Sequence, residues 1–241
     1  MRGEVEKTLM LYLPEENNTV HYHGDNDQVL MLQEFVEHGK FFPCDGPDCY
    51  ITLNGNLLII EHFQFTCSKK TKKGDVQNLE LARIDRHGYG ISYHEKIKLP
   101  SSGNHYLSNV ISSFDKHYQK IQRYIEKCLS LSNDVSESDI IICFLIDDVS
   151  IVGSSYLDKS SGALYRGNIA DCMEFLTHFR DHPRVNWVLS GSSRDAKDHQ
   201  VWFISQKYID EYIKHALSYS DKHFPYDEVH VIQEIYPSCG R

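Results

Sequence analysis

The feature that most constrains the fold is the dipeptide Asn54-Gly55, which lies between two apolar segments rich in β-branched residues. Asn-Gly is the strongest short signal for a two-residue type I′ turn, because both central residues of that turn need a positive φ angle. A hairpin closed by this turn has a fixed register, in which Cys49 pairs with Ile60. We therefore predict an antiparallel β-hairpin over residues 47–65.

The same register sets two acidic residues, Asp48 and Glu61, opposite each other. Opposed side chains lie about 5 Å apart, and like charges at that distance are destabilising. A divalent cation held between the two carboxylates would turn the repulsion into a binding site. Glu61 also follows an apolar run, and a buried carboxylate needs a cation, a donor or a proton. In the alternative interpretation, Asp48 only begins a strand after a turn and Glu61 is solvated at an exposed hairpin edge.

Segments with helical periodicity precede and follow the hairpin in the sequence. Residues 27–38 are predicted to form a helix that ends at the C-cap residue Gly39, and a second helix is expected at about 76–86. Apolar residues at three- and four-residue steps predict one long amphipathic helix from His105 to about Ser130. Residues 88–104, which contain three glycines and a proline, are expected to be irregular.

The apolar, β-branched run at 140–146 predicts a strand that is buried on both faces. The remaining predicted elements are strands at 8–13, 185–189 and 201–205 and helices at 168–180 and 207–220. Strands that alternate with helices indicate the α/β class. We expect a single domain over residues 1–241, with a central mixed β-sheet flanked by helices and a helical excursion around 88–138.

Composition limits the environment of the chain. The 241 residues are 41% hydrophobic, and no run approaches the roughly 20 apolar residues of a membrane span. The seven cysteines contain no Cys-x-x-Cys pair, so we expect neither a disulfide framework nor a structural zinc ion. These features predict a cytoplasmic protein that does not associate with a membrane.

The net charge of the chain restricts the kinds of partner that it could bind. A net charge of −9 argues against a protein that coats nucleic acid over its whole surface, because that affinity comes from Lys and Arg neutralising phosphates. Positive charge is nevertheless concentrated in one lysine segment, made of Lys69, Lys70, Lys72 and Lys73. This segment is a candidate contact for a nucleic acid backbone. A solvated loop is the alternative interpretation of this segment. A protein partner for the acidic surface is another option.

A helix carrying Glu, then Pro-Asp opening a strand, then Glu in the next apolar strand resembles the PD-(D/E)-x-K nuclease superfamily, which has the restriction-endonuclease-like fold. The resemblance covers about residues 27–86. It implies a restriction-endonuclease-like core in which Glu34 (or Glu37), Asp48 and Glu61 bind Mg²⁺ or Mn²⁺. In that family a lysine two residues after the second acid orients the attacking water.

That lysine position is occupied here by Phe63, which cannot hold a hydroxide. Three interpretations follow from the resemblance: the site is inactive, the lysine has moved, or another polar group replaces it. Lys69 and Lys70 are the candidate catalytic lysines. Gln64 is nearer in sequence, but strand alternation turns it to the opposite face.

The sequence therefore supports two main hypotheses. The first is a metal-dependent nuclease-like protein that acts on DNA or RNA phosphodiester bonds. The second is a catalytically inactive nuclease-fold protein that serves as a binding or regulatory module. A third option places a hydrolase or phosphotransfer site at Asp147 and Asp148, since carboxylates at the carboxyl end of a buried parallel strand often line a crevice.

Overall fold

The computed structural model describes residues 18–23, 26–87, 93–99, 103–132, 135–136, 139–150, 155–158, 164–166, 169–192, 199–216, 222–223 and 229–235. Contacts divide the chain into two compact units, each assembled from three segments. The first unit comprises Met1–Phe65, Ile111–Val149 and Asn168–Tyr219. The second comprises Thr66–Val110, Ser150–Gly167 and Ser220–Arg241.

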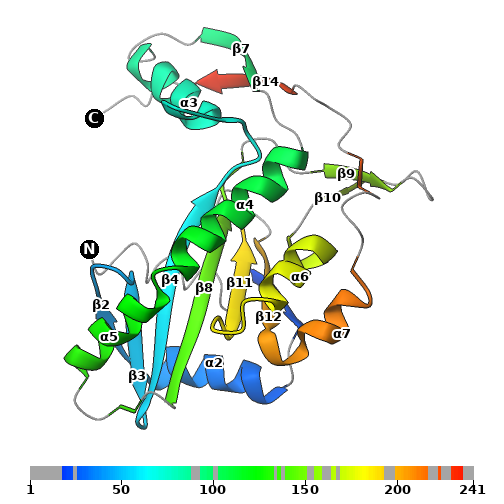
Figure 1. Ribbon diagram of the computed structural model, residues 1–241. Coiled ribbons are helices and arrows are strands. Elements are labelled where there is room, and N and C mark those ends of the chain that lie inside the picture. Colours follow the sequence, from blue (N-terminus) through cyan, green and yellow to red (C-terminus); the bar gives the residue numbers. More distant parts are fainter. Residues whose placement is uncertain are drawn as a thin grey trace. The chain divides into compact units, whose positions relative to one another are not determined.

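A seven-stranded mixed sheet forms the centre of the first unit (Figure 1). Across the sheet the order is β1 (Asn18–His23), β12 (His199–Ser205), β11 (Trp187–Gly191), β8 (Ile140–Asp148), β4 (Asn56–Phe65), β3 (Cys49–Leu53) and β2 (Lys40–Pro43). The central strand β8 runs parallel to both of its neighbours, β4 and β11. The pairs β2–β3, β3–β4 and β11–β12 are antiparallel, which makes the sheet mixed, as predicted.

The hairpin prediction is confirmed. Asn54 and Gly55 form the turn, with φ angles of 50° and 85°, and Cys49 pairs with Ile60. Strand β4 is buried along most of its length because β3 and β8 flank it and helices cover both of its faces. The strand predicted at 140–146 is also confirmed, and it continues to Asp148.

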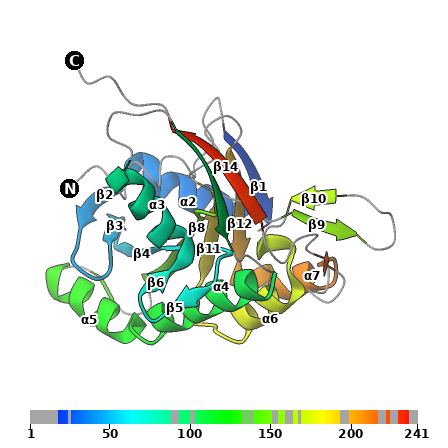
Figure 2. The same ribbon diagram turned by 90° about the horizontal axis from the view of Figure 1, so that it is seen from above.

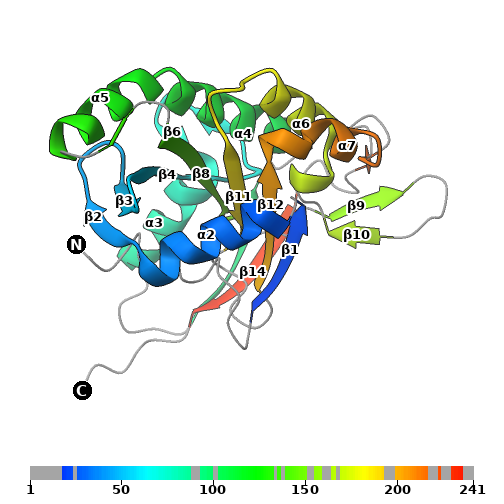
Figure 3. The ribbon, with the colours of Figure 1, turned by 90° about the horizontal axis from the view of Figure 1, so that it is seen from below.

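Helices cover both faces of this sheet (Figures 2 and 3). Helix α2 (Asn26–His38) packs Leu32 and Phe35 against one face, in a core that includes Leu58 and Ile60 of β4. On the other face, Phe114 of α4 (Gly103–Tyr118) contacts Phe144 of the sheet, and α5 (Ile121–Leu131) and α6 (Met173–Arg180) lie beside it. The sheet is therefore the middle layer of three, and its alternate residues face different helices.

Gly39 ends α2 as predicted, but for a reason of space. A Cβ atom at this position would lie 2.3 Å from Cγ2 of Ile51 and 2.3 Å from the carbonyl oxygen of Phe35. The chain leaves the helix and enters β2 directly against β3, so that only glycine fits.

The prediction of one long helix from His105 to about Ser130 is wrong in one respect, because this segment forms two helices. Helix α4 ends at Tyr118 and α5 begins at Ile121. At the junction the N–H of Lys120 donates to the carbonyl of His117, which is the tighter three-residue turn, before α5 resumes. Neither glycine nor proline marks the break, so helical periodicity could not reveal it.

The later elements of the first unit begin or end at other residues than predicted. Within the helix predicted at 168–180, residues 169–180 form a 3₁₀ turn (Ile169–Asp171) followed by α6, and β11 runs from Trp187 to Gly191. The helix predicted at 207–220 is a 3₁₀ turn (Gln206–Tyr208) followed by the short α7 (Ile209–Ile213), and residues 217–221 lie outside the described part. The strand predicted at 8–13 lies outside it as well.

The second unit holds smaller sheets. Strands β5 (Lys70–Thr71) and β6 (Gly74–Asp75) form a short hairpin before α3 (Val76–His87), which confirms the predicted helix. Within residues 88–104, predicted as irregular, β7 (Tyr93–Leu99) pairs along its whole length with β14 (Val229–Ile235). Its partner lies far along the chain, beyond the reach of a local composition rule. Strands β9 (Ser155–Asp158), β10 (Leu164–Arg166) and β13 (Lys222–His223) form another sheet.

None of the helices in the described residues is long and apolar enough to cross a membrane.

Candidate functional site

Asp48 and Glu61 lie at the open end of the β3–β4 hairpin. The ladder ends at the Cys49–Ile60 pair, and Asp48 is one residue further along. Its Oδ2 accepts a hydrogen bond of 2.7 Å from the backbone N–H of His62. Burial raises the pKa of the Asp48 carboxyl, and the charge of Glu61 adds to the rise, although the hydrogen bond from His62 opposes it. The two carboxylates are thus close enough to repel each other.

The Glu61 side chain is buried, with 5% of its surface exposed, which excludes the interpretation as a solvated acid at an exposed edge. One carboxylate oxygen, Oε1, accepts a 2.6 Å hydrogen bond from the hydroxyl of Tyr124 and also contacts Nδ1 of His117. The other oxygen, Oε2, is buried without a hydrogen-bond partner among the described residues. Burial, followed by the hydrogen bond to Glu61, raises the pKa of Tyr124, so that its hydroxyl keeps the proton that it donates.

The two side chains that contact Oε1 of Glu61 lie on either side of the break between α4 and α5. Helix α4 ends at Tyr118, directly after His117, and α5 begins at Ile121, before Tyr124. One oxygen atom of Glu61 thus contacts side chains from two helices.

Phe63, at the lysine position of the nuclease pattern, shares the face of Glu61 as strand alternation predicts. Its side chain is buried and stacks on the imidazole of His117, with ring centroids 4.9 Å apart and planes inclined by 5°. It also contacts Phe144 edge to face. Phe63 thus fixes the imidazole beside the carboxylate of Glu61.

A second polar group lies on the opposite face of the sheet. Asp147, at the carboxyl end of β8, is fully buried, and its Oδ2 accepts a 3.1 Å hydrogen bond from Gln64. Nε2 of His62 lies 3.9 Å from the same oxygen. Gln64 therefore points away from Glu61, as predicted. Asp147 is a buried member of a polar cluster, whereas the neighbouring Asp148 is half-buried.

The remaining predicted residues are two acids of α2 and the lysine segment. Glu34 and Glu37 are on the exposed side of α2, which covers the sheet face opposite to the one that Glu61 points to. Their role as a third metal ligand stays a prediction. The lysine segment, Lys69, Lys70, Lys72 and Lys73, belongs to the second unit, and its four side chains are exposed.

Sequence reasoning missed a third cluster, formed by Asp115, His178 and His182. One ligand atom from each lies within 4.8 Å of the others. The signal in the sequence was the four-residue spacing of the two histidines, of which His178 is in the last turn of a predicted helix and His182 is two residues beyond its end. The aspartate comes from α4, and nothing local connects it with α6.

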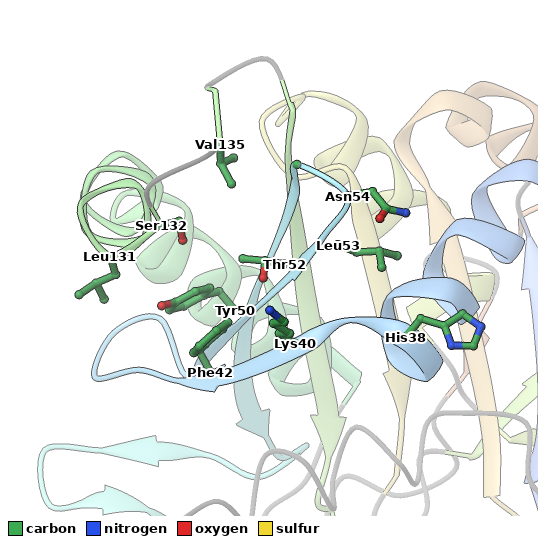
Figure 4. A pocket seen from close by; sticks show the side chains of 11 residues that line it. His38, Lys40, Phe42, Tyr50, Thr52, Leu53, Asn54, Leu131, Ser132 and Val135 are labelled. Atoms are coloured by element: carbon green, nitrogen blue, oxygen red, sulfur yellow. The ribbon is translucent and has the colours of Figure 1, made fainter.

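A hollow lies beside the edge strand β2 (Figure 4). Phe42 and Tyr50 stack on each other there, with ring centroids 4.9 Å apart, and Leu131 and Ser132 at the end of α5 form another side. None of its described lining residues is acidic, so the hollow offers no carboxylate ligands to a cation.

The arrangement of Asp48 and Glu61 has definite chemical capabilities. Hard carboxylate oxygens suit Mg²⁺ and Mn²⁺, and a buried oxygen without a donor suits a cation. The imidazole of His117, which contacts Oε1 of Glu61, is a group that could accept or donate a proton there. Comparison with protein-family models, with curated proteins and with solved structures gives no match to this chain.

Proposed function

We propose that this chain is a nuclease-like protein with a restriction-endonuclease-like core, which uses a divalent metal ion to act on DNA or RNA phosphodiester bonds. Asp48 and Glu61 would hold Mg²⁺ or Mn²⁺. The observation that carries the proposal is the buried Oε2 atom of Glu61, which has no hydrogen-bond partner among the described residues. The charge of Glu61 also raises the pKa of the Asp48 carboxyl, so the two acids influence each other. An unpaired buried carboxylate oxygen is costly, and a cation would compensate it.

The donor set fits the ion. Tyr124 and His117 occupy Oε1 and fix the orientation of the Glu61 carboxylate, which leaves Oε2 for a ligand. The backbone N–H of His62 fixes Asp48 in the same way. These are the supporting interactions that hold metal ligands in place in proteins. When bound, Mg²⁺ would polarise a phosphoryl oxygen and lower the pKa of a bound water.

Within this proposal, His117 takes the place of the missing lysine. Phe63 stacks on it and holds it against Glu61, so a group that can carry a proton lies beside the acids. Gln64, the nearer alternative in sequence, bonds to Asp147 on the other face. The lysine segment would contact the phosphate backbone, because four exposed ammonium groups within five residues concentrate positive charge.

The test is a cleavage assay with Mg²⁺ or Mn²⁺ on single- and double-stranded DNA and RNA. Glu61→Gln and Asp48→Asn remove a charge from each acid with little change in shape, and both should abolish cleavage. Glu211→Gln, an exposed acid on α7, is the matched control and should cleave like the wild type. Cleavage that survives both hairpin substitutions would refute the assignment.

The second candidate is the inactive nuclease-fold module, and the buried Phe63 favours it. An apolar ring fills the position where the family's lysine would approach the water. A protein of this fold that binds a partner without cleaving phosphodiester bonds is consistent with that ring. Calorimetric titration of the folded protein with Mn²⁺ separates the candidates. Absence of binding at millimolar Mn²⁺ would leave the second candidate standing, and binding that Glu61→Gln abolishes would support the first.

A further inference from the structure

A cluster of two imidazoles and one carboxylate lies between α4 and α6, apart from the hairpin acids. Nε2 of His178 is 2.7 Å from Oδ1 of Asp115, and Nε2 of His182 is 3.6 Å from the same oxygen. We propose that Asp115, His178 and His182 form a binding site for a divalent transition-metal ion of the zinc class, independent of the proposed Mg²⁺ site.

The distances fit such an ion. Ligand atoms at about 2.0–2.1 Å from a tetrahedral Zn²⁺ lie about 3.3 Å from each other. The observed separations of 2.7 and 3.6 Å lie on either side of that value. All three ligand atoms lie within 4.8 Å of one another, so side-chain rotations would bring them into the first coordination sphere, where the ion replaces the proton shared by Asp115 and His178.

The second nitrogen of His182 supports the assignment. Nδ1 of His182 lies 2.6 Å from the carbonyl oxygen of His178, so that Nδ1 carries the proton and donates it. In a neutral imidazole the lone pair is then on Nε2, which is the atom that faces Asp115. Metal-binding histidines in proteins are oriented by this kind of hydrogen bond to a backbone carbonyl.

Aromatic rings hold the two imidazoles in position. Phe114 is fully buried and meets His178 and His182 edge to face, with centroids 5.4 and 5.5 Å away. Tyr118 meets His182 perpendicularly at 4.5 Å. The polar atoms stay accessible, since the side chains of His178, His182 and Asp115 are 20%, 23% and 42% exposed. An ion could enter from solvent and keep a water molecule as fourth ligand.

The mixed donors select the class of metal. Two nitrogens and one oxygen suit Zn²⁺, Co²⁺ or Ni²⁺, whereas Mg²⁺ prefers oxygen ligands alone. The hairpin acids have the opposite preference. The two sites should therefore respond to different ions, and the failure of one proposal leaves the other intact.

Titration of the full chain with Zn²⁺ by calorimetry, and with Co²⁺ by visible absorption, tests the site. We expect one ion per chain, with a cobalt spectrum of nitrogen and oxygen ligands and no thiolate bands. His182→Gln should weaken Zn²⁺ binding by about 100-fold and Asp115→Asn by about 10-fold. His38→Gln, an exposed histidine on α2, should leave it unchanged.

Asp115→Asn keeps a side chain that can hydrogen-bond to His178, so it tests the ligand without removing the packing. Wild-type affinity in both Asp115→Asn and His182→Gln would overturn the proposal. It would also be overturned by thiolate bands in the cobalt spectrum, or by absence of binding at micromolar Zn²⁺ in the folded wild type.

Discussion

The hydrogen bond from Tyr124 to Glu61 should contribute measurably to the stability of the first unit. Tyr124→Phe removes the hydroxyl and keeps the ring, which is almost completely buried. The lost bond is 2.6 Å long and ends on a buried carboxylate whose other oxygen has no hydrogen-bond partner among the described residues. After the substitution, the imidazole of His117 still contacts Oε1 of this carboxylate.

The magnitude follows from the charge of the acceptor. A hydrogen bond to a charged group contributes about 1.5–3 kcal/mol, roughly twice a neutral one. Because His117 still contacts Oε1, the carboxylate is not left wholly unpaired, and we expect a loss of about 2 kcal/mol. With a denaturant slope of about 2 kcal/mol per M urea, the unfolding midpoint would fall by about 1 M.

Tryptophan fluorescence during urea unfolding is the appropriate assay. Both tryptophans, Trp187 and Trp202, lie in neighbouring strands of the sheet that carries Glu61, so the signal reports the unit in which the substitution lies. Tyr118→Phe is the matched control, since its ring packs on Phe114 and His182, and we expect a change below about 0.5 kcal/mol. If Tyr124→Phe costs no more than Tyr118→Phe, the bond does not stabilise the buried acid and the reasoning is wrong.

Three further predictions concern the same hairpin and its neighbours. The raised pKa of Asp48 means that the folded state binds the proton of this carboxyl more tightly than the unfolded state does. The free energy of unfolding should therefore fall as the pH rises from the ordinary pKa of 3.8 through the raised pKa. Urea titrations at several pH values should show a smaller fall for Asp48→Asn than for the wild type. Mn²⁺ affinity, measured by calorimetry, should rise with pH through the same window because the ion displaces that proton, and a flat profile would contradict the role of Asp48. Gly39→Ala should lower the free energy of unfolding by about 3 kcal/mol, because the added Cβ would overlap Ile51 and the backbone of Phe35. Gly55→Ala, at a φ of 85° and with no atom near the added Cβ, should lower it by only about 1 kcal/mol in the same measurement.

The parts of the fold set by short-range rules were predictable. The Asn54-Gly55 turn determined the register of the hairpin, and the apolar run of β8 identified a strand buried on both faces. The alternation of side chains along the strand correctly predicted that Phe63 lies on the face of Glu61 and that Gln64 lies on the opposite face. Each of these inferences needed only the chemistry of neighbouring residues and the two-residue period of a strand.

The parts set by distant partners were not predictable. Strand β7 depends on β14, more than a hundred residues later, and the break at Gln119 and Lys120 carries no glycine or proline. The donors to Glu61 come from helices that the sequence showed only as one amphipathic segment. A carboxylate in an apolar run implied that some donor exists, but its identity depends on how the helices pack on the sheet.

The polar residues of α4 show why the site chemistry was harder to find than the core. Asp115 and His117 are two positions apart, so their side chains diverge by about 200° around the helix axis. Asp115 contacts His178 of α6, and His117 contacts Glu61 of β4. Between them lies the apolar stripe of Phe114 and Tyr118, which the periodicity did identify. A helix whose flanking positions are polar usually presents them to solvent, and only the packing of α4 against both α6 and the sheet turns these two residues into parts of separate sites.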